Sequence, residues 1–132
     1  MNRPVHFELH SVDPARTNAF FERVFGWKVT RWGGGSPGAP EYFLASTGAG
    51  TTASGGSWPG IDGGIMRSRD GQQRTVNTIQ VDDVDRCAAE VRAAGGNICV
   101  EKMAIPGVGY LMYATDPTGV LFGFMHADAG AK

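Results

Sequence analysis

The hydrophobic and polar positions of this chain follow the same order twice. Residues 5–29 begin with a strand pattern, pass an aspartate turn, carry an apolar stripe at helical spacing and return to a strand pattern after a glycine. Residues 75–100 show the same order, and a constant shift of 70 residues places Asp13 on Asp83. A repeat of this length is typical of one supersecondary unit. The sequence therefore predicts two similar halves.

Each half is predicted to contain a strand, a helix and three further strands. In the first half we expect strands at about 4–12, 27–31, 41–47 and 62–69, and a helix at 14–25. In the second half we expect strands at about 75–82, 97–103, 109–115 and 119–126, and a helix at 84–94. A tight turn is predicted at 116–119, and the glycine-rich stretch 48–60 is expected to be a flap or a functional loop.

The fold class predicted from this order is α+β. We expect a single domain over residues 1–132, with module 1 at about 4–69 and module 2 at about 75–126. Each βαβββ module hides one face of its sheet under its helix, which leaves the other faces to close around a shared space. The two tandem modules would then form a cup-shaped curved sheet with a cavity between them. That cavity is where we expect function to lie.

Composition narrows the classes of partner. The net charge is −1 and no cluster of Lys or Arg is present, which argues against nucleic-acid binding. No apolar run approaches the roughly 20 residues that cross a bilayer, so no membrane partner is expected. The first residues lack an apolar signal region, so we expect a cytoplasmic protein. Cys87 and Cys99 lie among apolar neighbours and are expected to be reduced thiols.

Six segments of the chain, in order, resemble the vicinal oxygen chelate superfamily, which includes glyoxalase I, bleomycin-resistance proteins and extradiol dioxygenases. They are FELHSVDP at 7–14, FFERVFGW at 20–27, IDGGIM at 61–66, AAGG at 93–96, PGVGY at 106–110 and DPTGVLFG at 116–123. The resemblance implies two βαβββ modules around a small-molecule cavity. Members of the superfamily often pair, so it also implies a homodimer.

The resemblance also implies where a metal would bind. Metal enzymes of the superfamily take one ligand from the first strand and one from the last strand of each half. Carried over by position, the first ligand is His6, while two others fall on Val76 and Gly123. The segment 62–69 holds no Glu, and its only carboxylate is Asp62. Valine and glycine have no side-chain lone pair for a metal, so no cofactor is predicted.

Strand alternation selects the side chains that would face the cavity. If Phe7 packs on the helix, then His6, Glu8 and His10 face the cavity. The other predicted ligand-binding residues are Thr78, Gln80, Gly123 and Met125 on the strands of the second half, Met66, Tyr110 and Met112 near the mouth, and Trp58 in the glycine-rich loop. Met66 and Met112 could instead fill gaps in the core.

The hypothesis that these residues favour is a small-molecule-binding protein of the glyoxalase/bleomycin-resistance type without the usual metal centre. It would bind or transform a small organic ligand, with His6 and Glu8 as the candidates for acid–base catalysis. An alternative is a metal-dependent lyase or dioxygenase with shifted ligands, in which a divalent ion is held by His6 and Glu8. A third alternative is an interaction module with no dedicated ligand.

Overall fold

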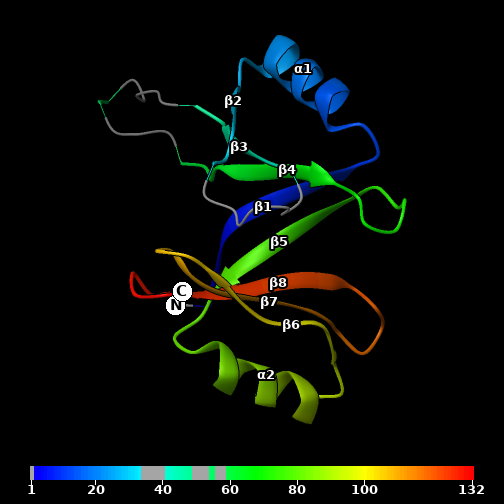
Figure 1. The fold of residues 1–132 in the computed structure, drawn as a ribbon, viewed down its shortest axis with the longest axis vertical. Coiled ribbons are helices and arrows are strands. Elements are labelled where there is room, and N and C mark those ends of the chain that lie inside the picture. The colour runs from blue at the N-terminus through cyan, green and yellow to red at the C-terminus, as the bar shows by residue number, and fades with distance from the viewer. Residues whose placement is uncertain (1, 34–40, 49–53, 56–58) are drawn as a thin grey trace. The chain divides into compact units, whose positions relative to one another are not determined.

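The computed structural model describes residues 2–33, 41–48, 54–55 and 59–132, which form two compact units (Figure 1). The N-terminal unit consists of His6–Gly33 and the described part of Pro37–Thr75. The C-terminal unit consists of Val76–Lys132 and the described residues that precede His6. Each unit is described below by itself.

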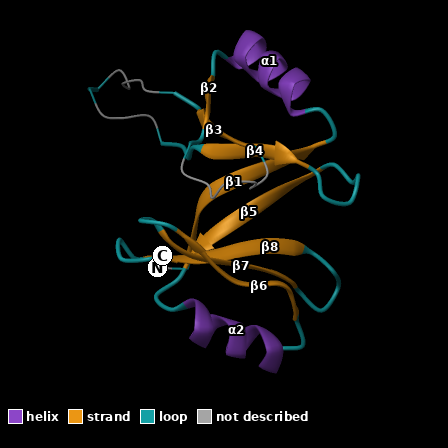
Figure 2. Ribbon diagram, in the orientation of Figure 1, coloured by secondary structure: helices purple, strands orange, loops and turns teal. Residues whose placement is uncertain are grey.

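The order of elements is the predicted one. The first repeat contains β1 (Arg3–Ser11), α1 (Pro14–Phe25), β2 (Lys28–Arg31), β3 (Tyr42–Ser46) and β4 (Gly63–Arg67). The second contains β5 (Arg74–Gln80), α2 (Val84–Ala93), β6 (Asn97–Ile105), β7 (Gly109–Thr115) and β8 (Leu121–Ala127). Figure 2 shows the helix of each repeat beside the strands of the same repeat. The α+β class with two βαβββ modules is confirmed.

The two repeats share one strand topology. In the N-terminal unit the strand order is β2-β3-β4-β1, and β1 runs parallel to β4. In the C-terminal unit the order β6-β7-β8-β5 is equivalent, and β5 runs parallel to β8. The remaining pairs are antiparallel. The repeat read from the sequence is therefore a repeat of hydrogen-bonding pattern as well.

Both helices begin at the predicted aspartates. The side chain of Asp13 accepts a hydrogen bond from the amide of Arg16 at the start of α1, and Gly26, at φ 70°, ends that helix in the left-handed conformation. The side chain of Asp83 accepts from the amides of Asp85 and Arg86 at the start of α2. These amide donors hold the pKa of Asp83 below its ordinary value.

Most strand boundaries lie one or two residues from the predicted ones. β8 begins at Leu121, two residues later than expected, because Asp116 accepts hydrogen bonds from the amides of Thr118 and Val120 and holds both residues in the turn. β6 continues to Ile105, and its register with β7 shifts twice on the way. Such irregularities of one strand leave no clear signal in a single sequence.

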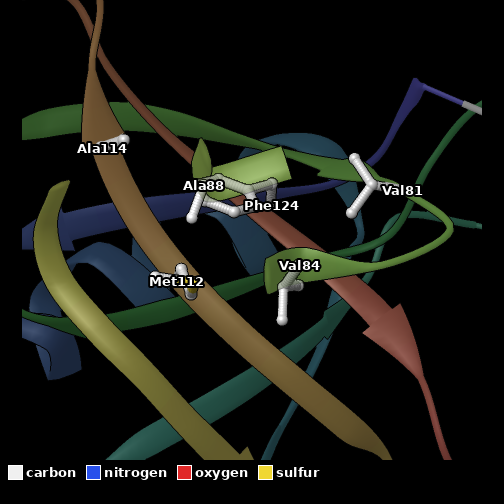
Figure 3. Packing of buried hydrophobic residues seen from close by; sticks show 6 residues of the cluster. All are labelled: Val81, Val84, Ala88, Met112, Ala114 and Phe124. Carbon is white, nitrogen blue, oxygen red and sulfur yellow. The ribbon is translucent and has the colours of Figure 1, made fainter. Parts of the chain in front are cut away.

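The core of the C-terminal unit lies between α2 and its strands. Its buried members are Val81, Val84, Ala88, Met112, Ala114 and Phe124 (Figure 3). Phe124 is fully buried at the centre of β8. In the N-terminal unit, aromatic rings join α1 to the sheet: Phe21 stacks on Trp27 at 4.7 Å between ring centroids, and Phe7 of β1 lies 5.5 Å from Trp27.

Candidate functional site

The polar side chains of β1 lie on the sheet face opposite α1. Phe7 contacts Trp27 on the helix side, so its neighbours His6 and Glu8 project to the other face. The strand register shows what shares that face, because directly paired residues project to the same side. Glu8 pairs with Gly64, which pairs with Leu44. In the next row His10, Met66 and Tyr42 are paired in the same way.

Four side chains on this face form a hydrogen-bonded group, which we call the Glu8 cluster: His6, Glu8, His10 and Tyr42. The Tyr42 hydroxyl donates to Glu8 Oε2 across 2.8 Å. His6 Nε2 lies 2.9 Å from the same hydroxyl oxygen, and His10 Nε2 lies 3.1 Å from Glu8 Oε1. The sequence prediction that His6, Glu8 and His10 share one face is thus realised, and Tyr42 is added to them.

Glu8 is the centre of the cluster. It is only 3% exposed, which is unusual for a glutamate. Burial of a carboxylate is costly unless its oxygens are hydrogen-bonded. Here each oxygen has a partner of its own, Tyr42 for Oε2 and His10 for Oε1. These two hydrogen bonds therefore offset the cost of burying a carboxylate here.

Gly64 makes room for the tyrosine. A Cβ built on Gly64 would overlap the Tyr42 hydroxyl and the adjoining ring carbons. Because Gly64 pairs with Glu8 across β4 and β1, the missing side chain lets the phenol lie over β4 and reach the carboxylate. The glycine is needed here for close approach, since its φ is not in the left-handed region.

Burial also sets the protonation state of His6. Desolvation holds the pKa of His6 below 6.5, although the nearby carboxylates of Glu8 and Asp62 act in the opposite direction. The imidazole is therefore neutral at pH 7, with one ring nitrogen as donor and the other as acceptor. A neutral histidine next to a buried carboxylate is suited to moving a proton.

We expect the ring of His6 to titrate at a pH below 6.5 in the folded protein. Because the pKa of His6 is lower in the folded chain than in the unfolded chain, protonation of the ring favours unfolding. His6 therefore lowers the free energy of unfolding only as the pH falls below about 6.5, and it has no such effect above that pH. The measurement is an NMR titration of the histidine rings, assigned with a His6→Gln variant. A His6 midpoint above 6.5 would contradict the assignment of burial as the dominant cause.

The other predicted site residues lie in different places. Met66 lies on the face of the Glu8 cluster, between His10 and Tyr42 in the register. Thr78, Gln80, Gly123 and Met125 lie on the paired strands β5 and β8 of the C-terminal unit. Trp58 falls outside the described residues.

The structure does not bring Tyr110 and Met112 to an open face. Met112 is 2% exposed and belongs to the core between α2 and the strands, and Tyr110 packs against the same core. Leu111 and Tyr113, the alternate residues of β7, lie on the opposite face with Met125. The packing therefore favours the alternative in which Met112 fills the core and does not bind a ligand.

A hollow of about 400 Å³ lies at the start of α1 in the N-terminal unit. Its lining residues are Ser11, Val12, Asp13, Arg16, Thr17, Phe20, Phe21 and Gln73. None of the site residues predicted from the sequence is among them. Ser11, which lines it, also caps the turn before the helix through its hydroxyl, so the hollow borders a structural cap.

The comparisons with known proteins bear on this geometry. The sequence model of one protein family, the glyoxalase/bleomycin resistance protein/dioxygenase superfamily, matches residues 3–124 of this chain. The chain belongs to this superfamily. The resemblance inferred from the sequence motifs is thereby confirmed, together with the fold that it implied.

Several solved structures of similar fold align with almost the whole of this chain, at low sequence identity. A methylmalonyl-CoA epimerase in complex with methylmalonyl-CoA and NH4+ is 16% identical, with a TM-score of 0.68 over 100% of this chain and 99% of the other. The hypothetical protein BH1468 from Bacillus halodurans is 12% identical, with a TM-score of 0.68 over 98% and 97%. At such identities the likeness shows the fold alone.

Curated relatives match only a segment. The proteins named "Putative glyoxylase CFP32" of Mycobacterium bovis and Mycobacterium tuberculosis are 45% identical over 42 residues, which are 32% of this chain. The match spans 16% of the length of those relatives. Neither of the helices in the described part of this chain has the length and apolar character that a membrane-spanning helix needs.

The residues present do not fit the usual metal centre of the superfamily. Val76 and Gly123 offer no side-chain donor atom. The pair Glu8–Gly64 in β1 and β4 is equivalent to the pair Thr78–Gly123 in β5 and β8, so the last strand of the first half also has a glycine at this position. Among the residues that the structure describes, no three His, Cys, Asp or Glu side chains lie so that they could hold a metal ion.

Sequence reasoning missed Tyr42 and Gly64. Both lie in segments that were predicted as strands, but neither was singled out as a site residue. Strand alternation gives the face of a residue within its own strand, and it does not tell which residue of another strand will lie opposite. The available signal was the pair of glycines at 63–64 inside a strand pattern, which is typical of close approach by another group.

Proposed function

We propose that this chain binds a small, partly polar organic ligand at the Glu8 cluster, without the superfamily's usual metal centre. The observation that carries the proposal is the buried carboxylate of Glu8, 3% exposed and held between Tyr42 and His10. Buried polar groups of this kind contribute less to stability than apolar packing would. A functional role explains why they are present.

The second repeat acts as an internal comparison. Its strand β5 carries Thr78 at the position of Glu8 and Val76 at the position of His6, and it forms the same parallel pair with the last strand of its repeat. Val76 there packs in an apolar cluster with Leu111. The βαβββ topology therefore does not require a charged group at this position, which supports a binding role for the one in the first repeat.

Apolar side chains adjoin the cluster, as a site for an organic ligand needs. Leu44 pairs with Gly64 on the same face and is 41% exposed. The indole of Trp32 meets the Tyr42 ring edge to face, with 6.1 Å between centroids. An apolar part of a ligand can contact these two side chains while its polar part reaches His6.

The test is a thermal-shift screen of aldehydes, thiol adducts, aromatic compounds and antibiotics. A ligand that binds only the folded chain raises the melting temperature. Substitution Tyr42→Phe removes the hydroxyl that donates to Glu8, so the affinity for the ligand found is expected to fall by about tenfold or more. Thr75→Val, which removes an exposed hydroxyl from β5, serves as the matched control and should leave the affinity unchanged.

Two results would contradict the proposal. The first is a ligand whose affinity is the same for wild type and Tyr42→Phe. The second is near-stoichiometric Ni, Zn, Fe or Mn in protein purified without chelator and lost on substitution of His6, which would support the metal-dependent lyase or dioxygenase instead. The shared cavity, the homodimer and the cytoplasmic location stay predictions from the sequence and its resemblance.

A further inference from the structure

The hydrogen-bond donors in the contacts of the Glu8 cluster are bonded to acceptors of the same cluster. A carboxylate has only lone pairs to offer, so the hydrogens of its contacts come from Tyr42 Oη and His10 Nε2. Since the Tyr42 hydroxyl donates to Glu8, its oxygen can only accept in its contact with His6, and the proton of that contact lies on His6 Nε2. Three donors are thus directed at partners within the cluster.

This arrangement leaves His6 Nδ1 as an acceptor. The imidazole is neutral because burial lowers the pKa of His6, and a neutral ring with its proton on Nε2 carries a lone pair on Nδ1. Within the described part of the chain, the hydrogen bond of His6 is the one made by Nε2. A ligand at this nitrogen must therefore donate a hydrogen.

Two negative charges lie near His6. The carboxylates of Glu8 and Asp62 both interact electrostatically with the imidazole. Asp62 is itself held in place, because its Oδ1 accepts from the amide of Thr47 across 2.9 Å. The potential at His6 favours a positive group over a negative one.

The adjoining rings favour the same kind of ligand. Aromatic faces attract ammonium groups, and an indole is the strongest of them. Trp32 lies in contact with the Tyr42 ring, on the strand β2 side of the cluster, and is only partly buried. Leu44, on the same face, provides apolar surface for the body of a ligand.

We propose that the Glu8 cluster recognises an organic amine. The amine donates a hydrogen to His6 Nδ1, its positive charge lies near the carboxylates of Glu8 and Asp62, and its apolar part contacts Leu44 and Trp32. This inference rests on the proposed function and adds the ligand class to it: a cationic or neutral donor is accepted, and a carboxylate of the same size is rejected.

Three probes of one shape test the ligand class: benzylamine, benzyl alcohol and benzoate. Their binding to the full chain is followed by NMR, from the ring signals of His6 and His10 and the indole signal of Trp32. A fragment of this size binds in about the millimolar range when it fits its site. We expect benzylamine to bind at least about tenfold more tightly than benzoate, with benzyl alcohol between them.

Two variants separate charge from hydrogen bonding. Glu8→Gln keeps an acceptor for Tyr42 but removes the charge, so benzylamine should bind about tenfold more weakly. Glu41→Gln removes the same charge from an exposed ion pair with Arg31 and should leave binding unchanged. If Glu8→Gln does not fold, His6→Leu removes the Nδ1 acceptor and leaves Tyr42 able to donate to Glu8, and it should weaken benzylamine in the same way.

The outcomes distinguish this inference from the proposed function. Benzoate that binds as tightly as benzylamine, with shifts at His6, overturns the amine assignment and leaves the cluster as a binding site. Benzylamine that causes no shift at His6, His10 or Trp32 up to about 10 mM also overturns it. The proposed function itself fails on different results: a ligand from the wider screen that binds independently of Tyr42, or a stoichiometric metal ion that is lost on substitution of His6.

Discussion

Substitution Gly64→Ala is expected to lower the free energy of unfolding by about 1–3 kcal/mol and to displace Tyr42 from Glu8. The new Cβ would overlap the phenol of Tyr42, so either β4 or the tyrosine must move. If the tyrosine moves, Glu8 loses the hydrogen bond to Oε2. The loss of this hydrogen bond to a buried carboxylate would lower the free energy of unfolding further. Ligand binding at the cluster should be lost together with the hydrogen bond.

Urea unfolding of a double-mutant cycle measures this coupling. The three atoms nearest to the added Cβ all belong to Tyr42, so Gly64→Ala should cost much less in a Tyr42→Ala background than in wild type. Gly60→Ala is the matched control, because a Cβ at Gly60 meets nothing within 4 Å. An equal cost of Gly64→Ala in both backgrounds would show that the glycine is not there to admit the tyrosine.

Truncation of Phe124 to alanine is expected to have the largest effect on stability, about 3–5 kcal/mol. Its side chain is fully buried and packs with Val84 and Ala88 of α2 and with Met112 of β7 (Figure 3). Its removal takes away the apolar surface that was shielded from water and leaves a cavity among side chains that can relax only in part.

Denaturant unfolding followed by circular dichroism measures the change in stability. Phe20→Ala in α1 is the control, because Phe20 is 56% exposed and its truncation removes the same atoms from the surface. We expect the control to change the unfolding free energy by less than about 1 kcal/mol. Equal losses for the two variants would contradict the assignment of Phe124 to the core.

Local features of the chain were predictable because they depend on neighbours in sequence. Asp13 caps α1 and Gly26 ends it through hydrogen bonds and backbone angles set within one turn of the helix. The alternation of β1 is equally local, so the common face of His6, Glu8 and His10 followed from it. The repeat strengthened these predictions, because each element was seen twice.

The strand β7 shows where a local pattern fails. Its residues from Tyr110 to Ala114 are almost all apolar, so no polar face marks the outer side. The structure places Met112 under α2 and Leu111 on the opposite face. Only the register with β8, in which Met112 pairs with Phe124, decides between these two choices.

By itself, the sequence determined the α+β class, the repeated order of strands and helices, the helix caps and the polar face of β1. The tertiary structure alone decided that Tyr42 meets Glu8 and that Gly64 leaves space for it. The physical reason is that β1, β4 and β3 are neighbours in the sheet although they are far apart in the chain. Register between such strands depends on the packing of the whole unit, which no short stretch of residues encodes.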